Sequence, residues 1–244
     1  MTENKSTVRF APWVGLNYER GFRELRILLV CESHYASKKH ERPTVTPEII
    51  KALALGEKHP LAIGKLRRHK HFTLIMSAVQ NVRQRFSDAQ RREFWNSVAY
   101  YNFLQEFLPT SRVAPSSEIW KRSEKAFDEV LTVLAPDLII CFSKRNGNRV
   151  RSLSGSMPVA VVNHPSSYFT YSKVNPVITM HIEMAKSQKA LAPEFVGSNL
   201  FDRWSEATAS ALPTPGPHLS EPDKIARLAE HGKSMAAFDE FLLM

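Results

Sequence analysis

The chain has 244 residues, of which 43% are hydrophobic and 23% charged, so it can bury one sizeable core without division into several domains. Its 33 Lys and Arg residues outnumber its 24 Asp and Glu residues; the net charge of +9 favours a polyanionic partner, although a merely soluble basic protein has the same balance. Two cysteines are too few for a four-cysteine iron–sulfur or zinc site, and no apolar run approaches the ~20 residues of a membrane span.

The first strand is expected at Arg26 to Val30, after an ordered loop around Trp13. It leads into a run of residues able to form hydrogen bonds: Cys31, Glu32, Ser33, His34 and Tyr35. Thr46 is a good N-cap and Pro47 suits the first helical position, so a helix is predicted from near Glu48.

A dense basic run follows this helix and consists of Lys65, Arg67, Arg68, Lys70 and the histidines 69 and 71. It either contacts phosphates or belongs to a solvated surface. Phe72 to Val82 has the apolar spacing of a core helix, and Gln90 to Trp95 is predicted as a short helix with Arg91 outside. Ser97 to Leu104 is rich in valine and aromatic residues, which indicates a central strand with Asn102 at its end.

The next predicted helix is capped by Ser116 or Ser117. Leu138 to Phe142 follows it and shows no alternation of apolar and polar residues, which is typical of a parallel strand covered on both faces. Its exit, Ser143 to Arg149, is basic and contains a glycine. This segment is therefore either a loop that approaches a phosphate closely or the N-terminus of a helix.

Val159 to Val162 is the last predicted strand, and Asn175 to Leu191 is a helix that closes the domain. Strands separated by helical segments predict an α/β fold: a three-layer α/β/α sandwich around a central, mainly parallel sheet of about four strands. We assign residues 1–212 to this domain. Residues 213–244 form a proline-rich linker and a short amphipathic helical tail.

Polar side chains stand at the predicted strand ends, where open α/β sheets bind ligands. The last strand runs directly into Asn163, His164, Pro165, Ser166 and Ser167. Taken singly, these side chains have ordinary structural explanations: Asn102 can cap a helix, His164 can be a hydrogen-bonded turn histidine, and Tyr35 can belong to the core.

In combination the segments resemble the uracil-DNA glycosylase superfamily. The resemblance rests on CESHY after the first strand, the asparagine of YYNF, the LIICF strand and the NHPSS turn after the last strand, and it covers roughly residues 13–190. It implies a uracil-DNA glycosylase-like fold and hydrolysis of the N-glycosidic bond of a flipped-out base, which leaves an abasic site. It also implies that no cofactor is required.

The resemblance and the basic segments together give each candidate residue a role. Catalysis is assigned to Glu32, Ser33 and His164; base binding to Tyr35, Asn102, His34 and Asn163; and phosphate binding to Ser166, Ser167, Lys144, Arg145 and Arg149. Glu32 or Ser33 stands where many members of the superfamily carry the Asp or Asn that orients water. The expected substrate is therefore uracil or a modified base, such as glucosylated hydroxymethylcytosine in phage DNA.

The chemistry suits this assignment, because a departing base carries negative charge and leaves an oxocarbenium-like sugar. Glu32 can stabilise the sugar or direct water, and His164 can stabilise the base. The alternative is a catalytically inactive DNA- or nucleotide-binding module of the same fold. The sequence contains neither the Gly-x-Ser-x-Gly motif of serine hydrolases nor the His-Glu-x-x-His spacing of a metal site, so neither of these classes is favoured.

These features predict a cytoplasmic protein that acts in DNA repair or antiviral defence. We expect it to work as a monomer on DNA, away from membranes and without a metal.

Overall fold

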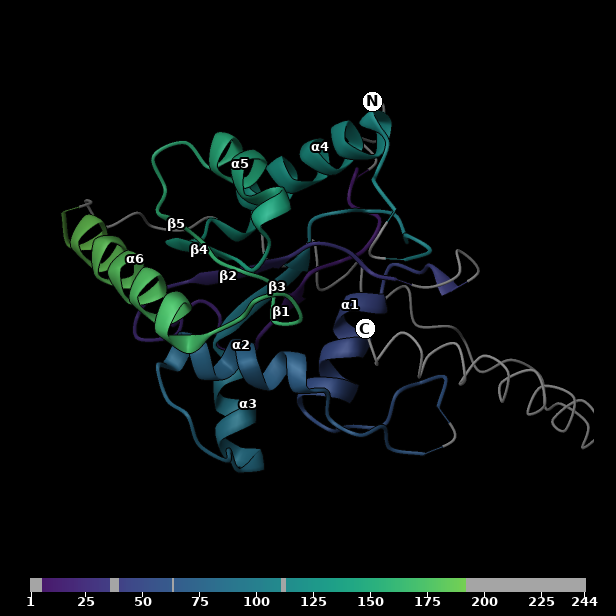
Figure 1. Ribbon diagram of the computed structural model, residues 1–244, viewed down its shortest axis with the longest axis horizontal. Coiled ribbons are helices and arrows are strands. Elements are labelled where there is room, and N and C mark those ends of the chain that lie inside the picture. Colours follow the sequence, from purple (N-terminus) through teal and green to yellow (C-terminus); the bar gives the residue numbers. More distant parts are fainter. Residues whose placement is uncertain (1–5, 36–39, 63, 111–112, 192–244) are drawn as a thin grey trace, which may run out of the picture.

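The structure is a computed structural model and describes residues 6–35, 40–62, 64–110 and 113–191 (Figure 1). The predicted linker and helical tail, and the domain boundary at residue 212, lie outside these residues. None of the helices in the described ranges is both long and apolar enough to span a membrane.

A five-stranded sheet forms the centre of the protein (Figure 1). The strands are β1 (Trp13–Val14), β2 (Ile27–Cys31), β3 (Val98–Asn102), β4 (Leu138–Cys141) and β5 (Val159–Val161). Their order is β1-β3-β2-β4-β5; the last four are parallel to their neighbours, whereas β1 pairs antiparallel with β3. The predicted α/β class is confirmed. The sheet is mixed and has five strands rather than about four, because the short β1 extends its edge.

Alternate residues of the central strand β2 enter two separate cores. Ile27, Leu29 and Cys31 belong to one apolar cluster, and Leu28 and Val30 belong to the other. Every residue of β2 is buried. This burial on both faces explains why the run is apolar throughout rather than alternating.

Helices cover both faces of the sheet (Figure 1). On the Cys31 face lie α1 (Val45–Ile49), the π-helix η2 (Ile50–Ala54), α2 (Lys70–Gln80), α3 (Asp88–Asn96) and α6 (Tyr171–Leu191). The opposite face is covered by α4 (Ser117–Leu134) and α5 (Lys144–Leu153).

Several helix ends differ from the sequence prediction. Helix α1 begins at Val45 with Thr44 as N-cap, before the predicted Thr46, and the Thr44 hydroxyl donates to Glu48 at 2.5 Å. Helix α6 begins at Tyr171, four residues before the predicted start, and contains a proline. For α4 the first alternative is confirmed, since Ser116 is the N-cap and accepts from the Ile119 N–H.

The predicted exposure of Arg91 was wrong. Arg91 in α3 is 8% exposed, and its Nη1 donates to Thr73 Oγ1 at 3.1 Å. Phe94 and Trp95 of the same helix are also buried. The helical pattern places Arg91 toward α2, where its hydrogen bond offsets part of the cost of burying the guanidinium.

Residues 143–149 start a helix, the second of the two alternatives for this segment. Ser143 caps α5 by accepting from the Asn146 N–H at 3.3 Å. Gly147 lies against β5, and a Cβ added there would come within 2.5 Å of Val161 Cγ1. The glycine therefore permits close packing of α5 on the sheet.

Replacing Gly147 by alanine should destabilise the fold by about 1–3 kcal/mol, because the added methyl group overpacks the contact with Val161. Urea denaturation measures the change. Gly64→Ala is the matched control, since a Cβ at Gly64 meets no atom within 4 Å. Equal stability of the two variants would mean that α5 shifts freely to accept the methyl group.

Candidate active site

A cavity of about 920 Å³ lies at the carboxyl ends of the parallel strands. Segments that follow β2, β4 and β5 line it, together with the end of β3 and the start of α2. Of the predicted site residues it includes Glu32, Ser33, His34, Tyr35, Asn102, Lys144, Arg145, Asn163, His164, Ser166 and Ser167. The structure thus brings together every residue assigned a role except Arg149.

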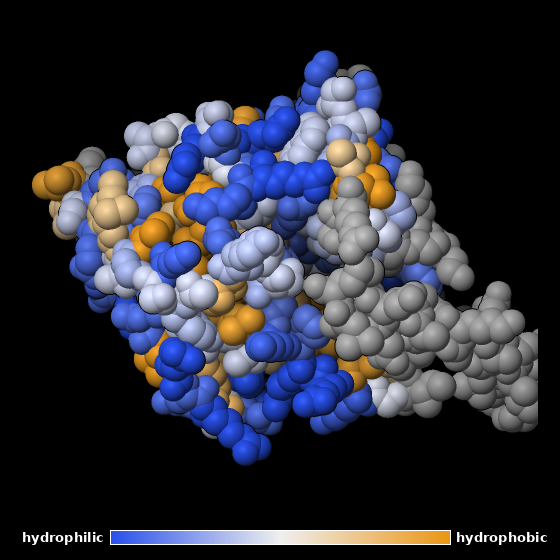
Figure 2. Space-filling view, in the orientation of Figure 1, coloured by the Kyte–Doolittle hydropathy of each residue, from blue (hydrophilic) through white to orange (hydrophobic). Residues whose placement is uncertain are grey.

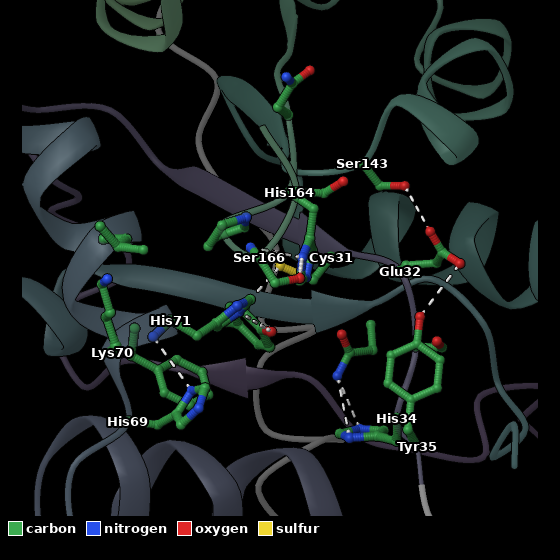
Figure 3. A pocket seen from close by; sticks show the side chains of 18 of the residues that line it. Cys31, Glu32, His34, Tyr35, His69, Lys70, His71, Ser143, His164 and Ser166 are labelled. Atoms are coloured by element: carbon green, nitrogen blue, oxygen red, sulfur yellow. Dashed lines mark hydrogen bonds between the residues drawn. The ribbon is translucent and has the colours of Figure 1, made fainter. Parts of the chain in front are cut away.

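Glu32 is held by three donors from different parts of the site (Figure 3). Its Oε1 accepts from Arg145 Nη1 at 2.8 Å and from the Tyr35 hydroxyl at 3.4 Å, and its Oε2 accepts from Ser143 Oγ at 3.1 Å. The side chain is 14% exposed. The Leu104 N–H also donates to the Glu32 carbonyl at 2.8 Å, so the backbone as well as the carboxylate is fixed.

The Ser143 hydroxyl links Glu32 to helix α5. It accepts from the Asn146 N–H as the N-cap and donates to the Glu32 carboxylate. The carboxylate consequently lies beside a helix N-terminus, where the aligned peptide dipoles favour negative charge. Tyr35 completes this side of the cavity; burial raises the pKa of its hydroxyl to about 12, so the group remains a donor. Ser33 Oγ lies beside that hydroxyl and is buried.

His164 lies in the turn after β5, and the turn itself sets the position of the ring proton. Its Nδ1 accepts from the Ser166 N–H at 3.2 Å and lies 2.7 Å from Ser166 Oγ. Burial lowers the pKa of His164 and outweighs the opposing effect of Glu32. A neutral ring whose Nδ1 accepts must carry its proton on Nε2, so His164 offers an N–H donor.

Two further hydrogen bonds fix the same turn. Asn163 Nδ2 donates to the Tyr168 carbonyl at 3.0 Å, and the Ser167 N–H donates to the His164 carbonyl at 2.8 Å. Tyr168 follows with a positive φ of 53° and a side chain 90% exposed. Ser166 and Ser167 are also exposed. The turn therefore presents two hydroxyl groups and an aromatic ring at the rim of the cavity.

His34 and Asn102 bond to each other at the floor of the cavity. Asn102 Nδ2 lies 3.0 Å from His34 Nε2, which is also 2.9 Å from Thr46 Oγ1. His34 is 2% exposed and Asn102 4% exposed. Asn102 Oδ1 is buried and has no hydrogen-bond partner among the described residues, so it can accept from a ligand that reaches the cavity floor.

The burial of His34 makes stability depend on pH. Burial lowers the pKa of His34 from 6.5 to about 3, so protons bind the unfolded chain more readily between these values. Stability is full above pH 6.5 and declines as the pH falls toward 3, by about 2 kcal/mol for this group between about pH 7 and pH 5. Urea denaturation at the two pH values measures the decline. His34→Gln should show a smaller decline than the unaltered chain; equal declines would assign the effect to other groups.

The basic residues of α5 that were predicted to bind phosphate make contacts within the protein. Lys144 Nζ donates to the Val161 carbonyl at 3.2 Å, and Arg145 pairs with Glu32. Arg149 lies against α4, where its Nε donates to Glu124 at 2.9 Å and its guanidinium stacks 4.1 Å from the Trp120 ring centroid. In the earlier basic run, Lys70 is exposed and lines the cavity.

Several residues that line the cavity were not assigned to it from the sequence: Cys31, His69, Lys70, His71, Tyr100 and Ser143. Cys31, His71 and His164 have ligand atoms that all lie within 4.8 Å of one another (Figure 3). The one signal in the sequence was the position of Cys31, which alternates with Ile27 and Leu29 and so shares their face of the sheet.

Comparison of the chain with protein-family models gives no match, and comparison with curated proteins gives none either.

Proposed function

We propose that the protein is a DNA glycosylase with a three-layer α/β/α fold like that of the uracil-DNA glycosylase superfamily. One observation carries the proposal: a fixed carboxylate, Glu32, and a neutral imidazole donor, His164, line the same cavity at the carboxyl ends of parallel strands. An N-glycosidase needs both groups, because its transition state separates a positive sugar from a negative base.

Each group acts on one of these charges. The carboxylate of Glu32 stabilises the oxocarbenium-like sugar or orients the water that attacks it. His164 donates from Nε2 to an oxygen of the departing base, and the Ser166 N–H keeps the ring in the required tautomer. Ser33 is a poorer candidate for orienting water, because its hydroxyl is buried beside Tyr35.

The cavity also offers contacts for the base itself. The ring of Tyr35 can stack on the base, and the free Oδ1 of Asn102 can accept from an exocyclic amine. The volume of about 920 Å³ lies near the upper end of the roughly 300–1,000 Å³ typical of small-molecule sites. This size favours a base that carries a bulky modification over plain uracil.

The rim of the cavity suits a DNA backbone. Ser166, Ser167 and Lys70 are exposed there and can contact phosphates, and hydrophilic side chains predominate on the face seen in Figure 2. The exposed ring of Tyr168 can fill the gap in the base stack that a flipped nucleotide leaves. The net charge of +9 supplies the sequence-independent attraction.

The test is a glycosylase assay with purified full-length protein. The substrates are uracil-containing DNA and DNA from phages with modified cytosines, and abasic sites are detected by alkaline strand cleavage. We expect cleavage of at least one substrate, with modified DNA preferred. If the protein binds DNA but produces no abasic sites on any substrate, the proposed glycosylase activity is ruled out.

That outcome would favour a DNA- or nucleotide-binding module, the second candidate. The observation in its favour is that Glu32 and Asn102 already have partners, Arg145 and His34 respectively. Such a module would bind DNA with a steep dependence on salt and leave the glycosidic bonds intact.

A further inference from the structure

Cys31, His71 and His164 form a compact cluster of metal-ligating side chains, although they come from three distant segments. Cys31 is the last residue of β2, His71 lies in the first turn of α2, and His164 lies in the turn after β5. Their ligand atoms all lie within 4.8 Å of one another. Figure 3 shows them gathered on the side of the pocket opposite Glu32.

The separations approach those of a tetrahedral zinc site. With Zn–S near 2.3 Å and Zn–N near 2.0–2.1 Å, the sulfur and a nitrogen would stand about 3.6 Å apart and two nitrogens about 3.4 Å apart. Cys31 Sγ lies 3.7 Å from His71 Nε2, so this pair already has the required spacing. The rings of His71 and His164 are tilted by 41° with centroids 4.9 Å apart. Because all three ligand atoms lie within 4.8 Å of one another, a shift of at most about 1.4 Å by the His164 turn would complete the set.

We propose that Cys31, His71 and His164 bind a zinc ion, with the fourth position open to the cavity. The donor set of one thiolate and two imidazoles matches the preference of Zn²⁺, and three protein ligands with an open position are typical of zinc sites that also hold water. Harder ions such as Mg²⁺ and Ca²⁺ prefer oxygen ligands and are not expected here.

The groups around the cluster suit this role. Ser166 Oγ lies 2.7 Å from His164 Nδ1, whereas the Tyr100 hydroxyl lies 3.4 Å from His71 Nε2 and would give up this contact to the metal. Zinc at Nε2 would shift the ring proton of His164 to Nδ1, where the Ser166 hydroxyl can accept it in place of the hydrogen bond that Nδ1 now accepts from the Ser166 N–H. Zinc would then displace one thiol proton to solvent.

Zinc and a departing base would compete for His164. The metal needs a lone pair on the ring, whereas the proposed glycosylase needs an N–H donor at Nε2. The loaded protein should therefore lose base excision, and removal of the metal should restore it. Binding of zinc itself does not depend on the glycosylase proposal, since it is measured without DNA.

The experiment loads purified full-length protein with Zn²⁺, removes unbound metal by gel filtration, and measures the remainder with a chromophoric chelator. We expect one zinc per chain from this site. Co²⁺ in place of Zn²⁺ should give a thiolate-to-cobalt charge-transfer band in the near ultraviolet. Cys31→Ser and His71→Ala should each weaken zinc binding by more than about 100-fold, and Cys31→Ser should abolish the band.

Two matched variants serve as controls. Cys141→Ser removes a second buried cysteine that lies in the opposite core, and His181→Ala removes a histidine of α6 outside the cavity. Both should bind zinc as the unaltered chain does. If Cys31→Ser fails to fold, the cobalt spectrum of the unaltered protein and the zinc titration of His71→Ala still test whether the site exists. Binding unchanged in His71→Ala, or cobalt without a thiolate band, would overturn the site.

Discussion

Glu32→Gln should lower the single-turnover rate of base excision by about 10³-fold, equivalent to about 4 kcal/mol of transition-state stabilisation. The substitution removes the negative charge that faces the developing oxocarbenium ion. It also leaves the guanidinium of Arg145 without its carboxylate partner at 2.8 Å, so a positive charge would then oppose the positive sugar. Quenched-flow measurement of abasic sites, with protein in excess over DNA, gives the rate.

The control for this prediction is Glu124→Gln. Glu124 also pairs with an arginine of α5, at 2.9 Å from Arg149 Nε, but it does not line the cavity. This variant should retain the rate. DNA affinity and unfolding temperature are measured for both variants. If Glu32 had only a structural role, Glu32→Gln would change these two quantities and leave the excision rate of the DNA-bound protein unchanged. A rate within tenfold of the unaltered chain would remove Glu32 from the mechanism.

His164→Ala should slow excision by about 10²- to 10³-fold, because the leaving base loses its hydrogen-bond donor. His164→Gln keeps an N–H donor and should give an intermediate rate. The same single-turnover assay is used, on metal-free protein. His181→Ala is the matched control, since its imidazole bonds to the Val177 carbonyl within α6 at 2.8 Å. If His164→Ala excises as fast as this control, negative charge on the base must be stabilised elsewhere.

The four parallel strands were predictable because each is a short run with a strong apolar bias. Their predicted positions agree with the structure to within a residue at most ends; β3 ends at Asn102, two residues before the predicted limit. Strand β1 was not predicted, since two residues carry no pattern and its pairing with Tyr100 and Ala99 depends on the finished sheet. The burial of Arg91 likewise depends on a tertiary partner, Thr73.

The cavity was predictable in outline for a topological reason. Parallel neighbouring strands end at one edge, so side chains that follow them meet there. The role of His71 was not predictable, because it contacts Cys31 and His164 only through the packing of α2 on the sheet. A metal site is recognisable from sequence when its ligands are closely spaced along the chain, and Cys31, His71 and His164 belong to three separate segments. The position of Arg149 outside the cavity was not predictable for a similar reason, since its partners belong to α4.

The central position of β2 has a consequence for the order of folding. Both neighbours of β2 come much later in the chain: β3 begins at Val98 and β4 at Leu138. At a ribosomal rate of roughly 5–20 residues per second, β2 waits on the order of 5–20 s before its second partner is synthesised. Until then an apolar strand has an unpaired edge, which is a site for aggregation or chaperone binding. The segment that carries Glu32 is therefore made early but takes its final position late.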